Sequence, residues 1–243
     1  MSNPLLDISG LPRFADFQTE YVTTAIDALL KENRTLLEQV RSDRQPVTWQ
    51  NFVQPMVDAN ERLSRAWGQV SHLNAVMNNL QLREVYNQNL PLITQFYAEL
   101  SQDLALFEKF KQLRKSNEFQ GLSTARKKII DNELRDFRLG GAELTADKKQ
   151  RFLEIQEALS KLSSNFSDNL LDATNAFALY IESEDTVKGI PNDVLQMAQE
   201  QAAADTKVGW KFTLHMPSYL PVMQYANNRD LREKMYHAYV TRA

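Results

Sequence analysis

The chain of 243 residues carries 28 Lys and Arg against 31 Asp and Glu, giving a formal net charge of −3, and 43% of its residues are hydrophobic. This balance is typical of a globular protein, and the lack of a concentrated basic region argues against a nucleic-acid binder. Disulfides and thiolate chemistry are excluded because there is no cysteine. No segment approaches the roughly 20 apolar residues of a membrane span. The amino terminus lacks the features of a secretory signal, so we expect a cytoplasmic protein that starts at Met1.

The first part of the chain predicts a series of helices. Gly and Pro are scarce, with 7 and 8 residues, and apolar side chains recur at helical spacing from Phe14 to about Val40 and from Pro55 to about Asn79. Between these helices, Thr48 can cap a short turn. A further helical pattern covers residues 80–114, where we expect Pro91 to break or kink the helix.

The longest predicted element follows the Gly140-Gly141 pair, which ends a helix capped by Ser123. Apolar residues spaced by three or four positions after Thr145 predict a helix of about thirty residues. We expect it to pack antiparallel against the preceding helix, with a coiled-coil dimer as the alternative. Its apolar seam is Phe152, Ile155, Leu159, Leu162, Phe166, Leu170, Ala173 and Phe177.

Strand patterns follow the long helix. Leu179–Ser183 predicts a short strand, and hydrophobic and polar residues alternate from Trp210 to Pro217, as in a half-buried strand. Between the two strands, a helix is predicted from Pro191 to about Ala204. The stretch PSYLP at 217–221 predicts a turn.

These patterns predict a mainly α fold, a multi-helix array with a long helical hairpin and a small β insertion. We expect residues 1–178 to form a helical amino-terminal lobe, and residues 179–243 to form a small β/α segment.

The last residues predict a helix capped by Asn227, with an apolar stripe that includes Leu231, Met235 and Tyr239. Neither Gly nor Pro follows to end it. We therefore expect the stripe to be exposed and the terminus at Ala243 to be a cut edge.

Metal-ligating residues are few. None of the three histidines, His72, His215 and His237, belongs to a His-Glu-x-x-His motif, which would place two zinc ligands one helical turn apart. Glu233 and His237 share a helix face and could supply two ligands, but a catalytic zinc needs three. A surface hydrogen bond or ion pair is the better interpretation of this pair.

Other candidate sites are also better explained by solvation. The basic run at 126–128 has acidic neighbours and predicts a mixed, solvated helix face. The acidic pairs Glu182 with Glu184 and Asp168 with Asp172 fit solubility better than acid–base catalysis. Nucleophile elbows, P-loops and dinucleotide fingerprints are absent. The sequence therefore predicts no catalytic, cofactor-binding or metal-binding residue, and the residues alone favour an interaction or structural module.

Several stretches nevertheless resemble the amino-terminal part of the thimet oligopeptidase and neurolysin family of zinc metallopeptidases, in order and over essentially the whole chain. They are GLPRF at 10–14, DFRLGGAEL at 136–144, LDATNAF at 171–177, GWKFTLHMPSYLPVM at 209–223 and NNRDLREKMYHAYVTRA at 227–243.

The resemblance implies a largely helical protein of two lobes around a deep, narrow channel that admits short peptides. The family's zinc ligands and general base lie in the carboxy-terminal half, and no residue here matches them. The resemblance thus implies that this chain forms part of the channel wall, is inactive alone, and binds no zinc itself. It also suggests that the strand and turn at 209–221 lie near the cleft. The alternative is a free-standing helical adaptor that binds a peptide or protein without catalysis.

Overall fold

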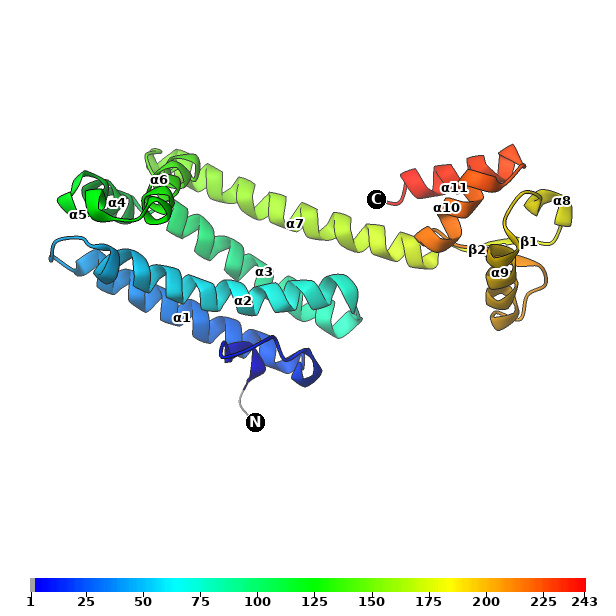
Figure 1. Ribbon diagram of the computed structural model, residues 1–243, viewed down its shortest axis with the longest axis horizontal. Helices are drawn as coiled ribbons and strands as arrows, with labels where there is room; N and C mark the ends of the chain where they lie inside the picture. The colour runs from blue at the N-terminus through cyan, green and yellow to red at the C-terminus, as the bar shows by residue number, and fades with distance from the viewer. Residues whose placement is uncertain (1–2) are drawn as a thin grey trace. The chain divides into compact units, whose positions relative to one another are not determined.

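The computed structural model describes residues 3–243, which form eleven α-helices and a two-stranded sheet (Figure 1). The chain divides into two compact units, Met1–Lys161 and Leu162–Ala243, and the boundary falls within helix α7 (Ala146–Ala176). The mainly α fold with a small β insertion is confirmed. Among the described residues, no helix combines the length and the hydropathy that a membrane crossing requires.

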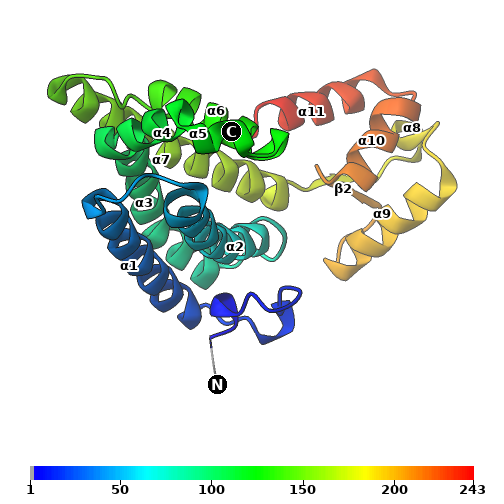
Figure 2. The same ribbon diagram turned by 60° about the vertical axis from the view of Figure 1, so that its left-hand side comes forward.

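The first unit is built on a long helical hairpin. Helices α1 and α2 lie side by side and run in opposite directions, and α3 packs against both (Figures 1 and 2). Helices α4 and α6 pack against each other. The helices are α1 (Glu20–Ser42), α2 (Gln54–Val76), α3 (Leu80–Ser101), α4 (Leu104–Lys115), α5 (Asn117–Gly121) and α6 (Thr124–Leu139), with 3-10 turns at Pro4–Leu6 and Phe14–Asp16 and a π-helical turn at Trp49–Val53.

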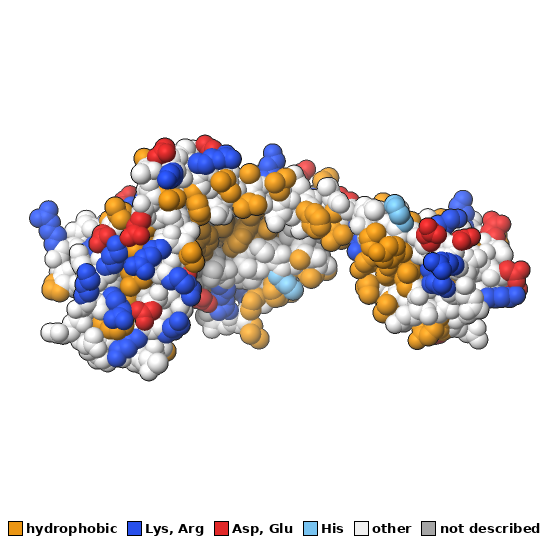
Figure 3. Space-filling model, turned by 90° about the horizontal axis from the view of Figure 1, so that it is seen from above, with side chains coloured by type: hydrophobic (Ala, Val, Ile, Leu, Met, Phe, Trp, Pro, Cys, Tyr) orange, Lys and Arg blue, Asp and Glu red, His pale blue; other side chains and the backbone are white. Residues whose placement is uncertain are grey.

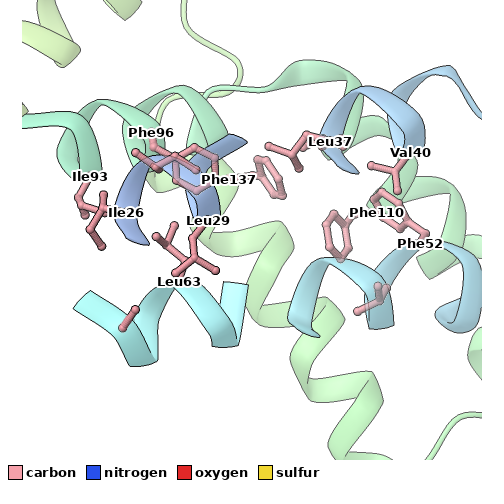
Figure 4. Close-up of a cluster of buried hydrophobic side chains, with 14 of the residues drawn as sticks. Ile26, Leu29, Leu37, Val40, Phe52, Leu63, Ile93, Phe96, Phe110 and Phe137 are labelled. Atoms are coloured by element: carbon pink, nitrogen blue, oxygen red, sulfur yellow. The ribbon is translucent and has the colours of Figure 1, made fainter. Parts of the chain in front are cut away.

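Aromatic side chains fill the core of the first unit (Figure 4). The rings of Phe52 and Phe110 meet edge to face with centroids 4.7 Å apart, and Phe137 lies 5.6 Å from Phe110 and 5.7 Å from Phe107. Such pairs stabilise a core beyond the burial of their area. Aliphatic residues of α1, α2 and α3, among them Ile26, Leu63 and Ile93, complete the same cluster.

Local capping signals were predicted well. The Ser123 side chain accepts a hydrogen bond from the backbone N–H of Arg126, and Thr48 forms a capping box with Asn51, whose backbone N–H lies 3.1 Å from the Thr48 hydroxyl. Of the break or kink expected at Pro91, the break does not occur, since α3 continues through this residue. The helical pattern is interrupted instead at Asp103, whose carboxylate caps α4 by accepting from the N–H of Leu106 at 3.0 Å.

Helix α7 has the predicted length, with 31 residues, but its seam is not the expected buried interface. Ile155, Leu159, Leu162 and Phe166 are 41%, 56%, 64% and 57% exposed. Among the described residues of the first unit, side-chain hydrogen bonds join the helix to the α3 segment, and none joins it to α6. Ser160 Oγ lies 2.9 Å from Thr94 Oγ1, and Lys149 Nζ donates to the backbone oxygen of Gln102 at 2.8 Å. The long hairpin of this fold is therefore α1 with α2.

The second unit surrounds a small antiparallel sheet, in which Leu179 pairs with Phe212 and Ile181 with Trp210. The second strand is shorter than predicted, and the expected turn at 217–221 was wrong, because helix α10 begins at Met216 and contains both prolines. The elements after α7 are β1 (Leu179–Ile181), α8 (Glu184–Val187), α9 (Asn192–Ala204), β2 (Trp210–Phe212), α10 (Met216–Tyr225) and α11 (Arg229–Val240).

Helix α11 is covered by its own unit. Leu231 and Met235 are buried in a core with α9 and α10, so the expected exposure of this stripe was wrong. The ring of Tyr239 stacks on Tyr219 of α10 with centroids 4.1 Å apart, which shows what covers the stripe. The N-cap is Asn228, one residue later than predicted, and its side chain accepts from the N–H of Leu231 at 2.9 Å.

Candidate functional site

A hollow of about 490 Å³ lies within the second unit, at the segment that the sequence associates with a cleft. This volume is in the range of pockets that bind small molecules. The hollow has an apolar part and a polar part. Its lining residues are Asn175, Ala176, Phe177, Ala178, Val194, Met197, Ala198, Gln201, Lys211, Thr213, His215, Pro217 and Ser218.

The alternation of the β2 segment creates the polar part of the lining. Trp210, Phe212 and Leu214 are buried in the core of the unit. The intervening residues Lys211 and Thr213, followed by His215, line the hollow. Successive side chains of an extended segment point to opposite faces, so one short stretch provides both the core and the lining.

Gly209 allows the chain to enter β2. Its φ of +89° is favourable for glycine, and a Cβ here would lie 2.1 Å from the carbonyl oxygen of Ile181 on the paired strand. At the other end of β2, the backbone N–H of Thr213 donates to Ser218 Oγ at 2.9 Å. This bond ties the end of the strand to the first turn of α10, where His215 is the N-cap residue.

A charged cluster lies at the edge of the hollow. Lys211 Nζ lies 2.5 Å from Asp205 Oδ2, and the Tyr180 hydroxyl donates to the same oxygen at 2.6 Å. The hydrogen bond from Lys211, followed by that from Tyr180, lowers the pKa of Asp205. The hydrogen bond to Asp205 in turn raises the pKa of Lys211 and of Tyr180. The ammonium group that reaches the hollow is thus matched by a carboxylate.

Four other polar side chains of the lining have no hydrogen bond to any residue between Asn3 and Ala243. They are the amides of Asn175 and Gln201, the hydroxyl of Thr213 and the imidazole of His215. Sequence analysis did not single out Asn175 or Gln201. The helical spacing of Val194, Ala198 and Gln201 on one face of α9 was the signal that could have found Gln201.

The histidines and the acidic pairs lie in several different settings. His72 is exposed, with its ring 5.6 Å from that of Phe14, and is a rim residue. Glu233 and His237 are both exposed on α11, and no hydrogen bond or ion pair among the described residues joins their side chains, contrary to prediction. Glu182 and Glu184 are exposed, as is Asp172, while Asp168 is half-exposed.

The basic run of α6 packs on aromatic rings of the first unit. The Arg126 guanidinium lies 4.8 Å from the ring centroid of Trp49, and Lys127 Nζ donates to the backbone oxygen of Gln120 at 2.8 Å. Trp49 is distant from Arg126 in sequence, so this cation–π contact forms only in the folded chain. The prediction of a solvated face overlooked this structural role.

The described residues do not fit a zinc site. Between Asn3 and Ala243, no three of the His, Asp and Glu side chains are grouped so that they could hold a metal ion.

The surface of the second unit is divided by side-chain type. In the view of this unit in Figure 3, hydrophobic side chains gather on one side, and charges of both signs intermix over the rest.

Comparison with known proteins identifies the family. Residues 26–149, just over half of the chain, match the Neurolysin/Thimet oligopeptidase, N-terminal domain. The chain belongs to this family. It is 47% identical over 244 residues to Oligopeptidase A of Haemophilus influenzae and 41% identical over 243 residues to Oligopeptidase A of Escherichia coli. It is also 37% identical over 250 residues to the Probable cytosolic oligopeptidase A of Arabidopsis thaliana.

Each of these alignments covers 100% of the chain but only 35–36% of the oligopeptidase. The chain therefore spans about a third of the length of the relatives it matches. Its neurolysin/thimet oligopeptidase region is the amino-terminal one, as the sequence resemblance predicted.

Proposed function

We propose that this chain is the amino-terminal region of a zinc-dependent oligopeptidase that hydrolyses short peptides inside a deep channel in the cytoplasm. The observation that carries the proposal is the similarity of the whole chain to oligopeptidase A proteins. In this proposal, residues 1–178 form the helical lobe, and residues 179–243 lead into a catalytic domain that carries the zinc ligands. The chain contributes a wall of the channel, with neither nucleic acid nor a membrane as a partner.

The architecture is compatible with a wall rather than with a catalytic centre. The described residues contain no metal-ligand group, whereas the second unit contains a hollow with unpaired polar side chains. The chain thus offers surfaces that can bind and orient a peptide, and the proposal assigns bond cleavage to the remainder of the parent protein. Zinc there would polarise the scissile carbonyl and activate water.

The proposal is tested with two proteins, the 243-residue chain and the longer product of its reading frame. We expect the longer protein to contain a His-Glu-x-x-His motif, retain stoichiometric zinc and cleave a quenched fluorescent peptide. In the same assays, the 243-residue chain should neither retain stoichiometric zinc nor cleave the peptide. Zinc-dependent cleavage by the chain alone would contradict the assignment of catalysis to the remainder.

A stop codon directly after Ala243 would instead support the second candidate, a helical adaptor that binds a peptide or protein without catalysis. The observation in its favour is that each compact unit has its own core. Peptide binding by an inactive chain of this length would then be the complete activity.

A further inference from the structure

We propose that the hollow of the second unit binds a short extended peptide, with Asn175 and Gln201 hydrogen-bonded to the peptide main chain. One apolar side chain of the peptide then lies against the floor formed by Phe177, Val194 and Ala198. This inference rests on the proposed function for the class of ligand, and it adds the residues that contact the peptide.

The polar lining suits a peptide main chain. Each side-chain amide offers a carbonyl acceptor and an N–H donor, the same groups that a peptide bond presents. Asn175 and Gln201 are exposed and have no hydrogen-bond partner among residues 3–243, so a ligand would replace only water at their amides. The Thr213 hydroxyl and the His215 ring add further hydrogen-bonding positions on the β2 side.

The charge of the hollow also favours main-chain recognition. None of the residues that line it is acidic, and the charge of its single ammonium group, on Lys211, is matched by Asp205 at 2.5 Å. A charged ligand group would have to compete with this ion pair. An uncharged stretch of peptide needs only the four unpaired side chains.

The apolar floor can accept different side chains. Val194 and Ala198 are buried members of the core of the unit, so the floor is firmly held. Met197 beside them is 44% exposed, and its unbranched thioether side chain can adapt to ligands of different shape. The site should therefore require an apolar residue without demanding a particular one.

A second possible occupant is another part of the parent polypeptide. Permanent interfaces are more hydrophobic than transient ones, and they resemble a protein core. Asn175, Gln201 and His215 are exposed and Thr213 is half-exposed, so the rim around the apolar floor is more polar than a permanent interface. These groups favour an exchangeable peptide.

Binding is tested on the 243-residue chain by NMR titration with acetyl-Gly-Gly-Leu-Phe-Gly-Gly-amide, and with acetyl-hexaglycine-amide as the ligand control. We expect saturable shifts confined to residues of the hollow, and at least fivefold weaker binding of the hexaglycine. Gln201→Ala should weaken binding of the Leu-Phe peptide by about fivefold, the effect of one net hydrogen bond. Gln199→Ala is the matched control, because Gln199 is exposed on the same helix and does not line the hollow.

Equal affinities for the two peptides, or equal effects of the two glutamine variants, would overturn the inference. In the longer protein, we expect Gln201→Ala to raise KM about fivefold with little change in kcat. A lowered melting temperature with an unchanged KM would show that the polypeptide itself covers the hollow, and this result also overturns it. Cleavage that is insensitive to Gln201→Ala overturns the inference about the hollow and leaves the proposed function standing. Peptide binding without cleavage by the longer protein removes the proposed function and supports the inference.

Discussion

The two compact units use their polar side chains in different ways. In the first unit, the buried Asn33 donates to the backbone oxygens of Leu29 at 2.8 Å and Ala59 at 3.2 Å, and so joins α1 to α2. In the second unit, the amides of Asn175 and Gln201 line a hollow and have no partner among the described residues. Buried polar groups that hold helices together are typical of a scaffold, whereas exposed amides around a hollow can hydrogen-bond either water or a ligand.

The two hydrophobic cores also differ in how they are built. The first contains most of the large side chains that are completely buried, including Phe96, Phe107 and Phe110. The second is built around two strands of three residues each, and it depends on α9, α10 and α11 for cover. A two-stranded sheet is marginal by itself, so the helices that cover it decide its stability.

The largest expected effects on stability come from truncating a large buried side chain in either core. Phe110→Ala should destabilise the first unit by about 3–5 kcal/mol, and Met235→Ala should destabilise the second by about 2–5 kcal/mol. Hydrogen exchange read by mass spectrometry can locate each effect, while urea unfolding measures its size. We expect exchange to accelerate in the unit that carries the substitution. Equal acceleration in both units would contradict the division into two separately packed cores.

Replacing one glycine in each unit by alanine should change the free energy of unfolding in opposite directions. Gly209→Ala places a Cβ against the Ile181 carbonyl oxygen at a φ of +89°, and should cost at least about 1–3 kcal/mol. Gly68→Ala lies within α2 with no atom within 4 Å of the added Cβ, and should stabilise by about 0.5–1 kcal/mol. Thermal unfolding measures both changes, and hydrogen exchange of residues 179–181 and 210–212 reports on the sheet. A neutral Gly209→Ala would show that the sheet tolerates a shift of its first strand.

The smallest expected effect concerns pH. The pKa of Asp205 is lowered in the folded state, so its contribution to stability is present above the ordinary carboxyl pKa of 3.8 and is lost as pH falls through the folded value. Asp205→Asn should therefore reduce the fall in melting temperature between pH 5 and about pH 2. Asp193→Asn, at an exposed aspartate of α9, serves as the control. If both variants retain the same acid dependence, the Asp205 cluster does not stabilise the second unit.

Much of the fold could be predicted from local signals. The caps at Thr48 and Ser123, the end of α6 at Gly140 and Gly141, and the length of α7 depend on neighbouring residues only. The alternation after Trp210 was also correct in direction, since it separates core from lining even beyond the strand. The strand itself ends at Phe212, because β1 offers only three residues with which to pair.

The errors share a physical cause. Pro91 and Pro221 lie inside helices, where tertiary packing has to offset the cost of a proline, whereas Pro217 lies in the first turn of α10, where proline is favourable. Partners distant in sequence could not be predicted, such as Trp49 beneath Arg126 and Tyr219 against Tyr239. The unpaired amides around the hollow belong to the same class, since a lone Asn or Gln in a sequence gives no indication of its surroundings.

The sequence by itself determined the mainly helical class, the caps at Thr48 and Ser123, and the lack of a zinc-binding motif. Its stretches also indicated membership of the neurolysin/thimet oligopeptidase family, which the comparisons show. Only the tertiary structure decided that α1 and α2 form the long hairpin, that Leu231 and Met235 are buried, and that α9 and β2 enclose a hollow. Local preferences depend on residues within one or two helical turns, whereas cores and hollows form where distant segments meet.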